Sequence, residues 1–217
     1  MIITKPKHVI EIFEFTEKFD KLMIAGCGGC ASVCSAGGEK EVEKLSRELQ
    51  KLYEEHNKTV VITTSVVVRQ CDHEYLEEID AQVKKADTIV SLGCGVGVQF
   101  LAERYNDKLV LPGLNTLSAG GTVQPGVWEE RCGLCGKCML HQTGGVCPVT
   151  RCAKSIQNGP CGGSQNGKCE IDPNIPCAWH LIYERLLAAG RLDLMMKYRP
   201  PKDWSKDRVR SFQNNKE

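Results

Sequence analysis

Thirteen cysteines distributed over 217 residues constrain this chain more than any other feature of its sequence. They form two sets, and the stretch from 95 to 131 between them contains no cysteine. The first set is Cys27, Cys30, Cys34, Cys71 and Cys94. The second set is Cys132, Cys135, Cys138, Cys147, Cys152, Cys161, Cys169 and Cys177. Disulfides, zinc sites and iron–sulfur clusters are the three structures that so many thiols can build.

The context of these thiols argues against disulfides. Their number is odd, and the N-terminal segment MIITKPKHVIEIFEF lacks the apolar core and small-residue cleavage site of a secretory signal. Apolar residues make up 41% of the chain, so a core can form without crosslinks. Because cytoplasmic thiols are kept reduced, we expect a cytoplasmic protein whose cysteines bind metal.

Charge and hydropathy exclude two kinds of partner. The formal net charge is +1, which gives no basic surface for nucleic acid. No apolar run reaches the roughly 18–20 residues that cross a bilayer. We therefore expect neither nucleic-acid binding nor membrane insertion.

The first half of the chain alternates between strand and helix patterns. Apolar or β-branched runs predict strands at 21–26, 59–68, 87–93 and 108–113, and amphipathic patterns predict helices at 39–56, 75–86 and 96–105. This alternation predicts an α/β domain over 1–113 with a flavodoxin- or Rossmann-like parallel sheet. The Gly- and Pro-rich stretch LPGLNTLSAGGTVQPG (111–126) is expected to be a linker. A small, irregular, cysteine-rich domain over 114–217 should follow, with a helix at 175–196 and a polar tail.

The cysteines of the first half lie where predicted strands end. In a parallel sheet these ends share the carboxyl edge, where ligands bind. Cys27, Cys30 and Cys34 in one loop, with Cys94 as a distant fourth ligand, suit a [4Fe–4S] cluster. Cys71 is then spare, or it replaces Cys27; as a simple alternative it is a small buried side chain.

The cysteines of the second half begin with a ferredoxin-like triplet. Cys132, Cys135 and Cys138 have the C-x2-C-x2-C spacing that favours a cubane cluster over zinc. Either Cys147 or Cys152 is expected to close this site. The remaining cysteines, among them Cys161, Cys169 and Cys177, are enough for another four-thiol site, where His180 is an alternative zinc ligand. We expect two or three [4Fe–4S] clusters, with structural zinc as an alternative for one, and a second half that folds only with its metals.

Three segments resemble a known family. They are GCGGCASVCSAGG (26–38), SLGCGVGVQ (91–99) and GKCMLHQTGGVCPVTRCAKSIQNGPCGG (136–163). They are similar to the methylenetetrahydrofolate reductase C-terminal family, and a chain of this length resembles the iron–sulfur small subunit of the two-subunit enzyme of acetogens and related bacteria.

The resemblance implies a role in one-carbon metabolism. The partner would be a flavin-containing TIM-barrel large subunit that reduces 5,10-methylenetetrahydrofolate to 5-methyltetrahydrofolate in the methyl branch of the Wood–Ljungdahl pathway, with FMN on that partner alone. The small subunit would pass electrons through [4Fe–4S] clusters, from ferredoxin or a larger redox complex, without catalysing a reaction itself. Its last helix and the region around Trp204 are candidates for the partner surface.

Two other functions remain open from the sequence. One is a zinc-stabilised assembly subunit without a redox role. The other is an enzyme with a substrate-binding cluster that has only three cysteine ligands.

Overall fold

A computed structural model describes residues 1–206 of the chain, and the polar tail beyond 206 lies outside the described residues. The chain divides into two compact units, which are described separately. The first unit is Met1–Trp128, and the second begins at Glu129. The sequence placed a boundary at 113/114, whereas the first unit continues through a further strand.

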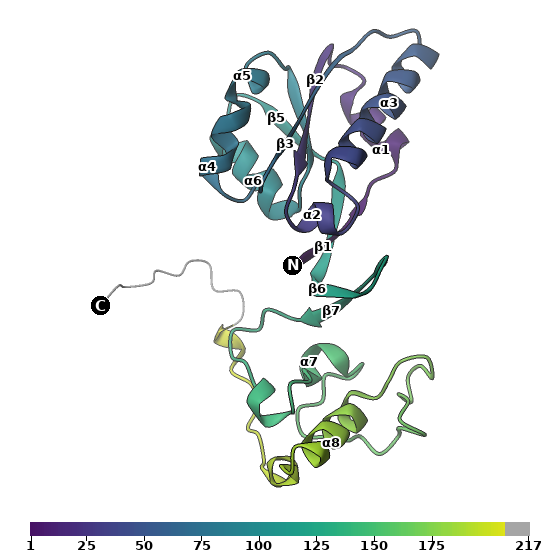
Figure 1. The fold of residues 1–217 in the computed structure, drawn as a ribbon, viewed down its shortest axis with the longest axis vertical. Coiled ribbons are helices and arrows are strands. Elements are labelled where there is room, and N and C mark those ends of the chain that lie inside the picture. Colours follow the sequence, from purple (N-terminus) through teal and green to yellow (C-terminus); the bar gives the residue numbers. More distant parts are fainter. Residues whose placement is uncertain (207–217) are drawn as a thin grey trace, which may run out of the picture. The chain divides into compact units, whose positions relative to one another are not determined.

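A four-stranded parallel sheet forms the centre of the first unit (Figure 1). Its strands are β2 (Lys21–Cys27), β3 (Val61–Val67), β4 (Thr88–Leu92) and β5 (Leu109–Pro112). They pair in the order β3-β2-β4-β5, and every pairing is parallel. The predicted α/β class is therefore confirmed. The order runs 2-1-3-4 along the chain, as in flavodoxin-like sheets, and it places a switch point between β2 and β4.

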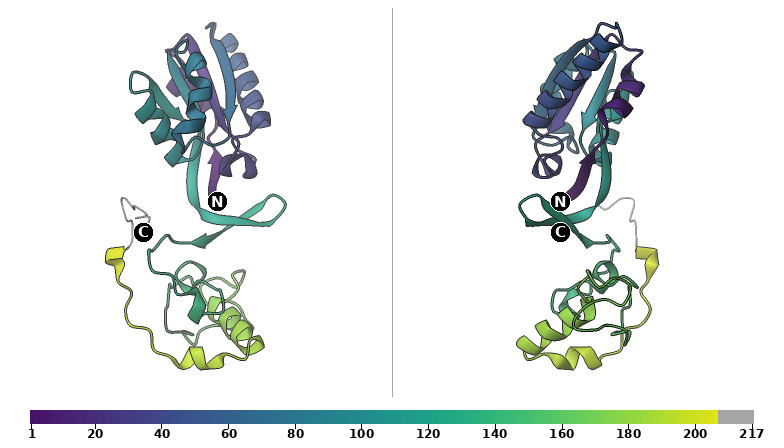
Figure 2. Two further views of the ribbon diagram at one scale, coloured as in Figure 1. Left: turned by 60° about the vertical axis from the view of Figure 1, so that its left-hand side comes forward. Right: turned by 90° about the vertical axis from the view of Figure 1, so that its right-hand side faces the viewer.

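Helices cover both faces of this sheet (Figure 2). One face packs against α1 (Val9–Thr16) and α3 (Glu39–Glu55), and the other against α4 (His73–Leu76), α5 (Asp80–Val83) and α6 (Gly95–Arg104). Because side chains alternate along a strand, Leu22 and Ile24 of β2 face α3, whereas Met23 and Ala25 face the other helices.

The predicted helix at 75–86 is interrupted. A 3-10 turn, η1 (Glu77–Ile79), separates α4 from α5. Leu76, Ile79 and Val83 nevertheless lie in the same buried cluster. The spacing of these apolar residues therefore identified the buried face, although not the break in the helix.

The expected linker forms strands instead, so that prediction was wrong. Strand β6 (Leu114–Gln124) pairs antiparallel with β1 (Ile2–Pro6), and β7 (Val127–Cys132) completes a three-stranded sheet. Pro125 and Gly126 form the turn between β6 and β7, where Gly126 has a φ of 79° that favours glycine. The pairing of β1 with β6 is the reason that the first unit extends beyond 113.

Short helices and loops make up the second unit. The elements are η2 (Leu140–Gln142), α7 (Pro148–Arg151), α8 (Ala178–Ala188), η3 (Leu192–Met196) and η4 (Trp204–Lys206). The predicted helix at 175–196 is thus α8 followed by η3, and Gly190 at φ 66° lies between them. Trp179 and Ile182 of α8 are buried in a single small apolar cluster.

A buried arginine ties the loops of the second unit together. Arg199 is 5% exposed and donates from its guanidinium to the carbonyl oxygens of Gln142 (2.9 Å) and Leu194 (3.2 Å). Its backbone amide bonds to the Asn158 side chain at 2.8 Å, and its guanidinium lies over the Trp179 ring. Within 1–206, no helix is both long and apolar enough to cross a bilayer.

Candidate metal centres

Four cysteines of the first unit lie at the carboxyl edge of the parallel sheet. Cys27 is the last residue of β2, and Cys30 begins the short helix α2 (Cys30–Val33). Cys71 follows β3, and Cys94 caps α6 directly after β4. The amide of Gly28 donates to the carbonyl oxygen of Val67 at 2.8 Å, which holds the loop after β2 against the end of β3.

Electrostatics place these four thiols in one neighbourhood. Partial burial raises the pKa of the Cys71 thiol, and negative charge on Cys27, Cys94 and Cys30 raises this pKa further. Such coupling requires proximity, and it joins thiols that follow three different strands. We refer to Cys27, Cys30, Cys71 and Cys94 as the first thiol group.

Cys34 lies apart from this group. It is 5% exposed and packs in the apolar cluster on the α1 and α3 face. Its Sγ lies 3.7 Å from the carbonyl oxygen of Ile2, to which the thiol donates. Cys71 is therefore an alternative to Cys34 as the fourth cysteine beside Cys27, Cys30 and Cys94.

Four cysteines of the second unit line one open cavity of about 300 Å³. They are Cys132, Cys135, Cys138 and Cys147. Leu134 and Gly136 adopt positive φ values of 54° and 72°, which turn the loop around the cavity. The amide of Leu134 donates to Sγ of Cys132 at 3.4 Å. The sequence left open whether Cys147 or Cys152 joins the triplet, and the cavity includes Cys147. These four form the second thiol group.

The four remaining cysteines line a much smaller and more enclosed cavity. They are Cys152, Cys161, Cys169 and Cys177, and they form the third thiol group. The cavity has a volume of about 20 Å³. The amide of Cys169 donates to the carbonyl oxygen of Ile175 (2.9 Å), and that of Cys177 donates to the carbonyl oxygen of Gly167 (2.8 Å). These hydrogen bonds hold the loop that carries Cys169 and Cys177 in a compact turn.

His180 is not among the residues that line the third cavity. Its Nε2 lies 3.3 Å from a carboxylate oxygen of Glu184, one turn along α8, and its side chain is 44% exposed. The ring also packs on Gly167, where an added Cβ would lie 2.8 Å from the imidazole Cδ2. The structure therefore places His180 on the helix surface.

The thiols of each group lie near one another, but they do not converge closely enough to coordinate a single ion. Within residues 1–206, no set of three or more His, Cys, Asp or Glu side chains is close enough to hold a single ion. A cubane needs a wider spacing than one ion does, because each of its four irons takes one thiolate. Basic side chains line both cavities of the second unit. Arg131 and Lys137 line the cavity of the second thiol group, and Arg151 and Lys154 line that of the third. Arg131 and Lys154 are each paired with a carboxylate, of Glu129 and Glu170 respectively.

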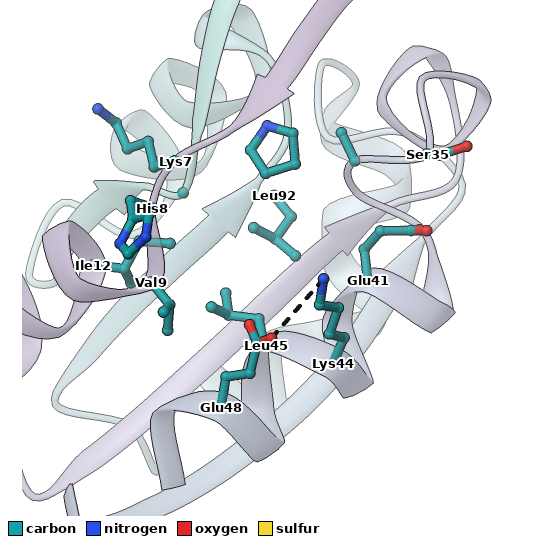
Figure 3. A pocket seen from close by; sticks show the side chains of 13 residues that line it. Lys7, His8, Val9, Ile12, Ser35, Glu41, Lys44, Leu45, Glu48 and Leu92 are labelled. Atoms are coloured by element: carbon teal, nitrogen blue, oxygen red, sulfur yellow. Dashed lines mark ion pairs between the residues drawn. The ribbon is translucent and has the colours of Figure 1, made fainter. Parts of the chain in front are cut away.

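A further cavity of about 380 Å³ lies between α1 and α3, and no cysteine lines it (Figure 3). The charged residues around it already have partners. Lys44 pairs with Glu48 at 3.9 Å, and Glu41 accepts a hydrogen bond from the amide of Gly38 at 3.0 Å. Its geometry therefore gives no indication of substrate chemistry.

Comparison with known proteins supports the family resemblance for the second part of the chain. Residues 111–205 match the family described as "Methylene-tetrahydrofolate reductase C terminal". No curated protein and no solved structure matches the chain significantly. The matched segment contains all cysteines of the second and third thiol groups. The chain is therefore similar to the methylene-tetrahydrofolate reductase C-terminal family over residues 111–205.

Proposed function

We propose that this chain is the iron–sulfur electron-transfer subunit of a methylenetetrahydrofolate reductase and has no substrate chemistry of its own. One observation carries the proposal. Of the thirteen cysteines, twelve fall into three groups of four, and Cys34 is the one outside these groups. Four thiols per group is the ligand number of both a cubane cluster and a structural zinc ion.

We propose that the first and second groups hold cubane clusters. The open cavity of the second group has room for a cluster, and its C-x2-C-x2-C loop wraps around that space. The amide of Leu134 donates a hydrogen bond to Sγ of Cys132. Hydrogen bonds of this kind tune the reduction potential of a cluster. Bound clusters would supply reversible single-electron transfer, and the chain's own residues would hold them and set their potential.

A single ion is proposed for the third group because its cavity, at about 20 Å³, is much smaller than that of the second group. Its four thiols would have to move closer together to bind one ion, since within residues 1–206 no such set is near enough. We propose a zinc ion held by Cys152, Cys161, Cys169 and Cys177, with a structural role. The ion pair between Lys154 and Glu170 lies beside this cavity and would close it from one side.

The partner in this proposal is a flavin-containing large subunit that reduces 5,10-methylenetetrahydrofolate to 5-methyltetrahydrofolate. FMN would be on the partner, and the electrons would come from ferredoxin or a larger redox complex. The family match over 111–205 supports this assignment. Tyr198 and Trp204 are 77% and 52% exposed, which makes this segment a candidate surface for the partner.

Electron delivery to the flavin tests the proposal. The chain, reduced anaerobically and freed of reductant, is mixed with the oxidised large subunit in a stopped-flow spectrometer. We expect the absorbance of the oxidised flavin, near 450 nm, to decrease after mixing, because electrons from the chain reduce the flavin. A Cys135→Ser chain, prepared in the same way, is the matched control and should transfer fewer electrons. An unchanged flavin spectrum with an iron-loaded, reduced chain would contradict the proposal.

A second candidate function is a zinc-stabilised assembly subunit without redox activity. The narrow third cavity favours it, because that cavity suits zinc whatever the other groups bind. In that case the complex with the large subunit would still form, although the chain would contain no iron.

A further inference from the structure

The side chain of Gln70 connects three segments of the first unit. It is fully buried, at 0% exposure. Its amide nitrogen donates to the carbonyl oxygens of Ala25 (2.8 Å) and Gly26 (3.1 Å) at the end of β2. Its amide oxygen accepts from the hydroxyl of Ser91 in β4 at 2.6 Å. Gln70 itself follows β3, so one side chain joins the ends of three neighbouring parallel strands.

Each of these three segments leads directly into a cysteine of the first thiol group. The Ser91 hydroxyl extends the network by accepting from the amide of Gly93 at 3.1 Å. The pairs of consecutive residues are Gly26–Cys27, Gln70–Cys71 and Gly93–Cys94. The network therefore fixes the residue that precedes each of three thiols.

Close backbone approach supports this role. A Cβ on Gly93 would lie 2.2 Å from the amide oxygen of Gln70, and one on Gly97 would lie 2.7 Å from the Cβ of Gln70. The turn between β4 and α6 thus rests directly on this side chain. The glycines in GCGVG allow that contact, which gives a packing reason for a pattern that otherwise resembles a nucleotide-binding loop.

We propose that Gln70 is the positioning residue of the first thiol group. It holds the ends of β2, β3 and β4 at the separation that lets Cys27, Cys71 and Cys94 bind one metal cluster. Only a side chain that both donates twice and accepts at this length makes all three bonds, and among natural residues that is glutamine. The inference rests on the proposed function, since it assumes that the group holds a metal cluster.

The test compares Gln70→Met with Thr88→Val in the full chain. Methionine keeps the volume of Gln70 and removes its three hydrogen bonds. Thr88 is also buried, and its hydroxyl donates to Leu109 at 2.7 Å, but it starts β4 at the opposite end of the strand from Cys94. We expect Gln70→Met to lose about four irons per chain, together with the electron paramagnetic resonance signal of that cluster. Thr88→Val should keep both.

A milder variant covers the case in which Gln70→Met does not fold. Ser91→Ala removes the hydroxyl that donates to Gln70 and accepts from the amide of Gly93, and it leaves the bonds from Gln70 to Ala25 and Gly26 in place. It should retain its iron but release it to a chelator about 10–100-fold faster than the wild type, as expected for loss of a group that orients a ligand. Wild-type iron content, spectrum and release rate in both Gln70→Met and Ser91→Ala would overturn the proposal.

A metal-independent measurement separates this inference from the proposed function. In the iron-free chain, mild oxidation followed by mass spectrometry should link Cys71 to Cys27 or Cys94, and Gln70→Met should reduce that link severalfold. Equal yields in the two chains would contradict the positioning role. A wild-type chain that cannot be loaded with iron would instead contradict the proposed function, and the oxidation result would still decide the role of Gln70.

Discussion

Replacing Cys71 by serine is expected to remove about four irons from the chain, whereas replacing Cys34 by serine is expected to remove none. The reason is the different environment of the two thiols. Burial raises the pKa of the Cys71 thiol, and the charges of Cys27, Cys94 and Cys30 raise it further. Cys34 is buried in the core and donates to the carbonyl oxygen of Ile2 at 3.7 Å. Serine at 34 preserves that donor, so the cost to stability should be small.

Iron content and the cluster's electron paramagnetic resonance spectrum measure the difference after anaerobic purification. Cys30→Ser is the positive control, because Cys30 belongs to the group under either choice of ligands. The spacing C-x2-C-x3-C, taken alone, favours the opposite result. If the Cys34→Ser chain lost four irons and the Cys71→Ser chain kept all of them, Cys34 and not Cys71 would be the ligand, which would contradict the proposed membership of the first thiol group.

Stripping all metal is expected to unfold the second unit and leave the parallel sheet of the first unit intact. The first unit has an apolar cluster on each face of its sheet, with Leu22 and Ile24 on one side and Met23 and Ile89 on the other. The described part of the second unit, 129–206, has one cluster of seven buried residues, and Cys177 is among them. A structural zinc ion contributes about 10–16 kcal/mol to folding, which is as large as the entire stability of a typical domain.

Limited trypsin digestion with mass spectrometry measures this outcome. In the stripped chain, cleavage should be rapid at Lys154, Lys168 and Arg185, while the loaded chain is cut there at least about tenfold more slowly. Sites in the first unit, such as Lys51 on α3, serve as the internal reference and should change little. A stripped chain whose second unit stays protected would show that its apolar cluster and the Arg199 network are sufficient for folding.

The parts of the fold that sequence patterns predict well are the local ones. Strands β2, β3 and β4 are rich in Val, Ile and Leu, and α3 has a clear apolar stripe, so their patterns identify them. The pairing of β1 with β6 joins residues more than a hundred positions apart, and β6 contains the polar, Gly-rich sequence LNTLSAGGTVQ. Nothing local in that sequence distinguishes a strand from a linker.

Contacts between distant parts of the chain also explain why the ligands of the first unit could not be chosen from cysteine spacing alone. The sequence predicts that all five cysteines of the first half lie near the carboxyl edge of the parallel sheet. Cys34 packs in the core of the first unit and contacts Ile2 of β1, an environment that the C-x2-C-x3-C spacing does not indicate. Gln70 carries no sequence signal either, since a glutamine after a strand is usually exposed. Both features depend on contacts that form only in the folded first unit.

Iron, acid-labile sulfide and zinc content of the anaerobically purified chain, co-expressed with a large subunit, tests the central claim most directly. Two cubane clusters and one zinc ion predict about eight irons, eight sulfides and one zinc per chain. About twelve irons and no zinc would assign a cluster to the third thiol group and keep the electron-transfer role. Zinc with negligible iron and sulfide would contradict that role and leave a chain whose thiols only hold its structure together.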